Sequence, residues 1–135
     1  DVKLDFESVA LAGSMLGSGG VTVMEEGTDM VWAALRLMEF FYHESCGKCS
    51  PCREGSSWLV QIMRRIVNKR GQMADLETLT DLCKNIAGRT VCAFGDAEVS
   101  PILSTLKHWR HEYVAMIHAA EAANLIRPEP AGAKH

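Results

Sequence analysis

The segment His43–Gly55, HESCGKCSPCREG, brings three cysteines into one short loop. Cys46, Cys49 and Cys52 occur at every third position, and a fourth cysteine, Cys92, follows much later in the chain. A structural zinc ion is usually bound by two separated pairs of cysteines, each forming one small knuckle. Three thiols in one loop favour a wider group, a [4Fe-4S] cluster, in which each iron takes one thiolate. Structural zinc and a set of disulfides are the alternatives.

The residues between these cysteines agree with a cluster. Gly47 lets the backbone approach closely and offer N–H groups to cluster sulfurs. Pro51 stiffens the turn and predicts that a helix starts at Cys52, where the helix dipole favours negative charge. A thiolate-bound cluster is negative, so we expect at least one of the nearby cations Lys48, Arg53 and Arg89 to raise its potential.

Four stretches of the chain follow the helical period of apolar residues. The expected helices run from Thr28 to the first cysteine, from Cys52 towards Gly71, from about Ala74 to Gly88, and from Ser100–Pro101 to about Ala123. Their apolar stripes include Val31, Met38 and Tyr42, then Trp58 and Met63, then Leu76 and Cys83, and finally Ile102, Trp109 and Tyr113. This pattern predicts a mainly α fold, a small four-helix bundle with the cluster at one end.

The remaining cysteine and the histidines are expected to bind no metal. Cys83 lies on an apolar stripe, where a small buried thiol needs no functional role. His43 is adjacent to the cysteine loop, and we expect it to tune or shield the site. Three further histidines, expected on the surface or facing a partner, lie along the last helix: His108, His111 and His118. No residue resembles a general acid, base or nucleophile, so no catalytic residue is predicted.

The N-terminal part is the least helical. Asp5 can cap a short helix from Phe6 to about Leu11, which Gly13 ends. The Gly17–Gly20 turn lacks the lysine and the helix start of a phosphate-binding loop. Val21–Met24 is a short β-like run. At the other end of the chain, Arg127–His135 has two prolines and small residues, which are typical of a mobile tail.

Composition limits the classes of partner. The 135 residues allow one domain with a modest core, and 47% of them are hydrophobic. A net charge of −3 argues against nucleic-acid binding. No apolar run is long enough to span a membrane, so no direct membrane insertion is expected. Five cysteines, an odd number, without a signal-peptide pattern favour reduced thiols with a metal-binding role.

Two motifs together point to a known family. His43–Gly55 and the later GRTVCAFGDA, Gly88–Ala97, resemble the C-terminal part of the NADH-binding flavoprotein subunit of respiratory complex I. Related diaphorase subunits of NAD-linked hydrogenases and formate dehydrogenases carry similar motifs. Ala12–Val21 is similar to the end of the β-grasp module that precedes the cluster domain in that family. The predicted organisation is a β-grasp remnant at 1–27, a helical [4Fe-4S] domain at 28–124 and a tail at 125–135.

The resemblance implies electron transfer within an NADH:quinone oxidoreductase. A [4Fe-4S] cluster on Cys46, Cys49, Cys52 and Cys92 would take electrons from reduced flavin and pass them to the next iron–sulfur cluster. FMN and NADH would bind an upstream part that this sequence lacks. The implied partners are other subunits, including iron–sulfur subunits, and the implied location is the cytoplasmic or matrix side of the membrane. Alternatives are the same role in a hydrogenase or formate dehydrogenase, or a zinc-stapled interaction module.

Overall fold

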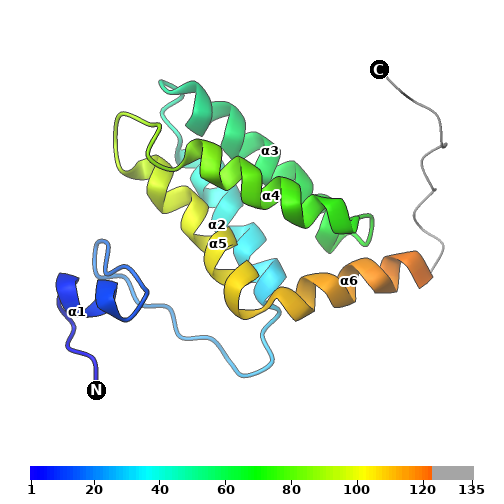
Figure 1. Ribbon diagram of the computed structural model, residues 1–135, viewed down its shortest axis with the longest axis horizontal. Helices are drawn as coiled ribbons and strands as arrows, with labels where there is room; N and C mark the ends of the chain where they lie inside the picture. Colours follow the sequence, from blue (N-terminus) through cyan, green and yellow to red (C-terminus); the bar gives the residue numbers. More distant parts are fainter. Residues whose placement is uncertain (123–135) are drawn as a thin grey trace.

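The computed structural model describes residues 1–122, and all of its regular structure is helical. The helices are α1 (Phe6–Leu11), α2 (Met30–Glu44), α3 (Ser50–Val67), α4 (Met73–Ile86), α5 (Phe94–His108) and α6 (Arg110–Ala122), as shown in Figure 1. The prediction of a mainly α fold is confirmed. The predicted tail at 125–135 lies outside the described residues.

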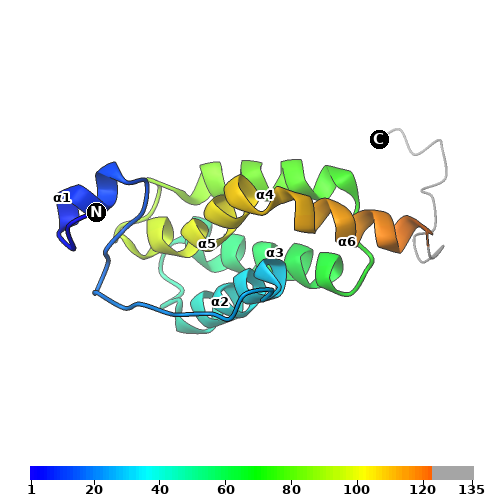
Figure 2. The same cartoon turned by 90° about the horizontal axis from the view of Figure 1, so that it is seen from below.

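Helices α2 to α5 form the predicted four-helix bundle. α2 packs against α3, α3 against α4, α4 against α5, and α5 against α2, so the four helices close into a ring. Because short turns join them, successive helices run antiparallel (Figures 1 and 2). α6 follows α5 and packs on α2, α3 and α5. The turn from α2 to α3 and the turn from α4 to α5 therefore lie at the same end of the bundle.

Apolar side chains from all five of these helices fill the core. The largest fully buried ones include Met38, Leu59, Met63, Leu76, Leu79, Ile102, Tyr113 and Ile117. Burying one large aliphatic side chain contributes roughly 1.5–3 kcal/mol relative to leaving it exposed. Two side chains on the predicted apolar stripes are not buried: Tyr42 is 48% exposed and Trp58 is 51% exposed. Trp58 lies at the edge of its stripe, over an open groove between α3 and α4.

Several helix boundaries differ from the prediction. Asp29, rather than Thr28, caps α2, because its side chain accepts from the backbone N–H of Trp32. The last predicted helix starts earlier, at Phe94, so that Pro101 lies inside α5. Two contacts hold this first turn: the Phe94 ring meets the ring of Phe41 edge-on at 5.4 Å, and Asp96 Oδ1 accepts from the N–H of Gly88. The first contact depends on a residue distant in sequence, and the second on a residue eight positions away.

The same predicted helix is also broken at Trp109, so it forms two helices, α5 and α6. Trp109 has φ −127° and ψ 29°, outside the helical region. The break lets α6 begin beside the start of α2, where Glu112 Oε2 accepts from the backbone N–H of Met30 at 2.9 Å. An unpaired N–H at the start of α2 is thereby satisfied by a side chain of α6.

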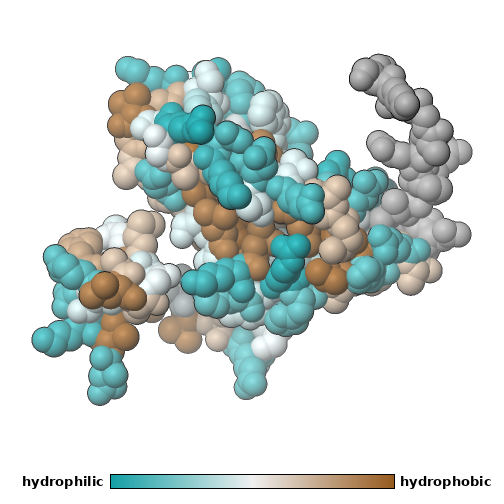
Figure 3. Space-filling model, viewed as in Figure 1, coloured by the Kyte–Doolittle hydropathy of each residue, from teal (hydrophilic) through white to brown (hydrophobic). Residues whose placement is uncertain are grey.

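The N-terminal residues form no part of the core. α1 begins after Asp5, whose side chain accepts from Ser8 N, as predicted, but α1 buries no residue. Figure 3 shows apolar side chains exposed on this segment, and Leu4, Phe6 and Leu11 are each at least 66% exposed. Val21–Met24, predicted as a β-like run, does not form a strand. Within the described residues no neighbouring strand is present to form hydrogen bonds with its backbone N–H and C=O groups. The β-grasp remnant is thus not observed.

A buried hydrogen bond joins α5 to α6, and its removal tests their packing. Thr105 Oγ1 and Tyr113 Oη lie 2.7 Å apart, and Thr105 Oγ1 also donates to the carbonyl of Pro101 at 2.6 Å. We expect Tyr113→Phe to lower the free energy of unfolding by about 1 kcal/mol, because Thr105 keeps its second partner. Denaturant unfolding measures this change. The exposed Tyr42 provides the control: Tyr42→Phe should change stability little, and equal losses in both variants would contradict the assignment.

Candidate metal centre

The two turns at one end of the bundle enclose a small cavity. Its volume is about 160 Å³, and its lining residues are Glu44, Ser45, Cys46, Lys48, Cys49, Cys52, Thr90, Cys92, Phe94 and Gly95. All four cysteines predicted as ligands line it, although Cys92 comes from a different turn than the other three. Cys83 does not line the cavity; it is fully buried in the core, as predicted. The ring of helices thus brings the four thiols together.

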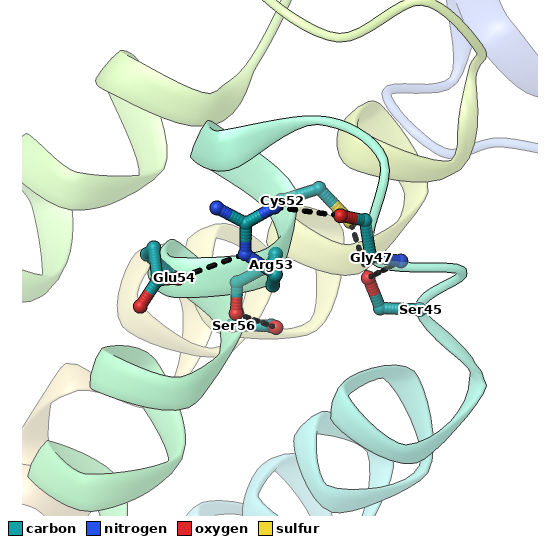
Figure 4. Close-up of polar contacts among 6 residues, drawn as sticks. All are labelled: Ser45, Gly47, Cys52, Arg53, Glu54 and Ser56. Atoms are coloured by element: carbon teal, nitrogen blue, oxygen red, sulfur yellow. Dashed lines mark hydrogen bonds and ion pairs between the residues drawn. The ribbon is translucent and has the colours of Figure 1, made fainter.

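The first turn carries three of the thiols, and their exposure to solvent decreases along the chain. Cys46 is exposed, Cys49 is half-buried at the N-cap of α3, and Cys52 is buried in the first turn of that helix. Gly47 has φ +77°, in the left-handed region that side chains disfavour. Its carbonyl accepts from Arg53 Nη1 at 2.7 Å, which fastens the turn to α3 (Figure 4). The start of α3 also places its positive dipole end next to these sulfurs.

Cys52 has two polar neighbours that the sequence did not indicate. Its Sγ lies 3.2 Å from Ser45 Oγ, and its thiol donates to Glu98 Oε2 at 3.1 Å. Burial, with a smaller contribution from Glu98, raises the pKa of the Cys52 thiol to about 11. Burial also raises the pKa of Glu98 to about 7. The hydrogen bond from the Cys52 thiol lowers the pKa of Glu98, but by less than burial raises it.

Glu98 is fully buried, and its Oε1 has no hydrogen-bond partner among the described residues. The sequence contains a feature that could have identified Glu98 as a residue of the site. Glu98 is at helical spacing from Phe94 and Ile102, so it falls on the apolar stripe of α5, where a carboxyl group is unexpected. A carboxyl on the buried side of the helix that follows Cys92 is a reasonable candidate for a residue facing the site.

The second turn brings Cys92 to the cavity and contacts the first turn. The backbone N–H of Val91 donates to Cys49 Sγ at 3.4 Å, and Thr90 Oγ1 donates to the carbonyl of Cys92 at 2.8 Å. Gly95 makes this geometry possible: a Cβ at that position would lie 2.4 Å from Thr90 Oγ1. The absence of a side chain at Gly95 thus lets the Cys92 turn lie close against α5.

The charged residues near the cysteines differ in whether they line the cavity. Lys48 lines the cavity, whereas the exposed Arg89 does not. Arg53 is paired with Glu54 at 2.8 Å. His43, expected to tune or shield the site, has an 85% exposed side chain that points to Glu44 and does not line the cavity. The shielding role of His43 therefore has no support in the structure, and His108, His111 and His118 are exposed, as expected.

The donor set fits an iron–sulfur cluster. All five cysteines are free of disulfides. Within residues 1–122, no three His, Cys, Asp or Glu side chains are placed to share a single metal ion. Four thiols that surround a cavity, rather than converge on one point, suit a group whose metals are spread apart.

Known proteins resemble this chain in sequence and in structure. Residues 32–116 match the model of the family described as NADH-ubiquinone oxidoreductase-F iron–sulfur binding region. An F-type subunit of NADH-quinone oxidoreductase in Rhizobium meliloti, designated F 2, is 53% identical over 117 residues, which are 87% of this chain and 28% of that protein. The F-type subunit of the same enzyme in Streptomyces coelicolor is 53% identical over 113 residues, 84% of this chain and 25% of that protein. The chain thus spans about a quarter of these relatives.

A crystal structure of an NAD⁺-reducing [NiFe]-hydrogenase in the H₂-reduced state has a similar fold, with a TM-score of 0.68 and 28% identity over 70% of this chain and 17% of the hydrogenase chain. In the part of the chain that is described, no helix is long and apolar enough to cross a bilayer. The match to the family covers both turns that enclose the cavity, the whole of α3, α4 and α5, and α2 except for its first two residues. The chain belongs to the NADH-ubiquinone oxidoreductase-F iron–sulfur binding region family, which is named for a 4Fe-4S cofactor.

Proposed function

We propose that this chain carries electrons through a [4Fe-4S] cluster held by Cys46, Cys49, Cys52 and Cys92. One observation carries the proposal: the four thiols predicted as ligands come from two distant turns and line one cavity. The bound cluster would supply one-electron redox chemistry. The chain's residues would hold it at the end of the bundle and limit the access of water.

The exposure of the four cysteines gives the site an inner and an outer side. Cys52 is buried and Phe94, which lines the cavity, packs on Phe41, so the inner side is shielded from solvent. Cys46 and Cys92 are exposed and form the outer side. A redox partner could approach most closely on the outer side. Electron exchange with a flavin and with another cluster would therefore be expected near these two cysteines.

We infer that the electrons come from NADH through FMN, both bound in a part of the protein outside this sequence. Residues 28–124 would form the cluster domain, and other subunits, among them iron–sulfur subunits, would be its partners. The whole would act as an NADH:quinone oxidoreductase, peripheral to the membrane on its cytoplasmic or matrix side. The 53% identity to quinone-reductase subunits, against 28% to the hydrogenase, supports quinone rather than hydrogenase chemistry.

The competing hypothesis is a zinc-stapled module in which the cysteines serve folding alone. Visible absorption, acid-labile sulfide and metal content of the purified chain separate the two. We expect a brown protein with about four iron and four sulfide per chain. A colourless protein that contains zinc and no sulfide would refute the redox function.

The ligand assignment can be tested by substitution. Replacing Cys46, Cys49, Cys52 or Cys92 by alanine should abolish the paramagnetic signal of the reduced [4Fe-4S] cluster, because a cubane needs four ligands. Cys83→Ala is the control, since it lies in the core: it should keep the cluster and cost roughly 1 kcal/mol in packing. Loss of the signal in Cys83→Ala, with retention in Cys92→Ala, would show that the fourth ligand is wrongly assigned.

Gly95 tests whether the close approach of the Cys92 turn matters. In Gly95→Ala the new methyl group would displace Thr90, and overpacking of this kind costs about 1–3 kcal/mol. If that strain is present in the cluster-bound form, loss of iron to a chelator should be about 5- to 150-fold faster. Gly20→Ala is the control, because a Cβ there meets nothing within 4 Å. Equal rates in both variants would mean that the turn does not constrain the site.

Lys48 is the cation best placed to affect the cluster, since it lines the cavity. A reduced cluster is more negative than an oxidised one, so we expect Lys48→Gln to lower the midpoint potential. Redox titration followed by paramagnetic resonance measures it. Lys69→Gln, exposed beyond the far end of α3, should leave the potential unchanged, because a distant charge is screened. An unchanged or raised midpoint in Lys48→Gln would show that this charge has no role.

A further inference from the structure

We propose that the hydroxyl group of Ser45 donates a hydrogen bond to the Cys52 sulfur and thereby raises the reduction potential of the site. The inference rests on the proposed function, because it assigns a role to Ser45 toward the cluster that Cys52 would bind. Ser45 is a positioning and tuning residue, since it would act on the redox centre through Cys52. Its sequence position, directly before Cys46, gives no indication of this role.

The contact spans the turn between α2 and α3. Ser45 is the C-cap of α2, and Cys52 lies in the first turn of α3. Ser45 Oγ is 3.2 Å from Cys52 Sγ, and both residues are at least partly shielded from solvent. The position of Ser45 is fixed by its own backbone, because its N–H donates to the carbonyl of Phe41 at 3.0 Å.

The direction of the hydrogen bond follows from the neighbouring groups. The backbone N–H of Gly47 donates to Ser45 Oγ at 3.4 Å, so the serine oxygen already acts as an acceptor on that side. Figure 4 shows the Ser45 hydroxyl between the Gly47 amide and the Cys52 sulfur. A cysteine that binds metal does so as a thiolate and carries no proton on sulfur. In the metal-bound form only Ser45 can therefore be the donor of the Ser45–Cys52 pair.

The hydrogen bond favours the reduced state. Reduction adds negative charge to the cluster and its sulfur ligands, and a donor aimed at one of those sulfurs stabilises that charge. The effect is larger in a partly buried site, where the local dielectric is low. Cys52 is the most buried of the four cysteines, so a hydroxyl donor should matter more here than at the exposed sulfurs of Cys46 or Cys92.

Substitutions at Ser45 in the cluster-loaded chain test the proposal. Ser45→Ala removes the donor, and at the wild-type midpoint potential we expect the ratio of reduced to oxidised cluster to fall about five- to tenfold; tenfold corresponds to about 59 mV for one electron. Ser50→Ala is the matched control, because Ser50 lies in the same motif, is exposed and should leave the midpoint unchanged. Redox titration with paramagnetic resonance and iron and sulfide contents are measured for each variant.

A second pair of variants separates the hydroxyl group from packing. Ser45→Thr keeps a hydroxyl, whereas Ser45→Val has nearly the same shape without one. A lower midpoint in Ser45→Val than in Ser45→Thr supports the proposal, and it decides the question even if Ser45→Ala fails to hold a cluster. Equal midpoints for threonine and valine would overturn it. A wild-type chain without any cluster would instead refute the proposed function, and that outcome is recognised by its lack of colour before any variant is compared.

Discussion

The closing of four helices into a ring is the constraint on which the site depends. Each bundle helix packs against two others, so the turn after α2 and the turn after α4 are held at the same end. Neither turn alone could complete a four-thiol site, since one supplies three cysteines and the other supplies one. The hydrophobic core, from Val31 to Ile117, is thus what positions the ligands. In turn, a group bound by both turns would cross-link α2–α3 to α4–α5, which a core of this size could use.

The polar contacts at the site are of two kinds: those to the Cys52 sulfur and those between the two turns. Ser45 and Glu98 reach the Cys52 sulfur from α2 and α5, while Val91 offers its N–H to Cys49. Because Gly95 has no side chain, Thr90 and the turn that carries Cys92 can lie close against α5. Burial raises the pKa of Glu98 to about 7 and so favours its neutral form, which repels a thiolate less than the charged carboxylate does. The inner side of the site is thus polar, although it is shielded from solvent.

The outer side and the N-terminal segment have a different character. Cys46, Cys92 and Val91 are exposed at the end of the bundle. The N-terminal residues up to Met24 leave several large apolar side chains in contact with solvent, and α1 buries none. The relatives are about four times longer than the matched segment, and subunits of larger assemblies often expose apolar surface that a neighbour covers. The partners proposed above agree with this exposure.

Local sequence signals were enough to establish the helical class, the approximate position of the bundle helices and the four cysteines around the cavity. Apolar residues at helical spacing predict amphipathic helices, and the cysteine spacing predicts a cluster rather than one ion.

The remaining features depend on how the helices and turns pack against one another. α5 starts at Phe94 because of contacts with Phe41 and Gly88, and the chain breaks at Trp109 so that Glu112 can reach the start of α2. Trp58 is exposed because the neighbouring helices leave it uncovered, and Val21–Met24 is no strand because no strand within residues 1–122 lies beside it. Glu98 lies 46 positions from Cys52 in the sequence, so their contact depends on how α3 and α5 pack and not on local spacing. Ser45 is only seven positions from Cys52, but the two side chains meet because the turn between α2 and α3 folds back on itself, which the residue types alone do not indicate.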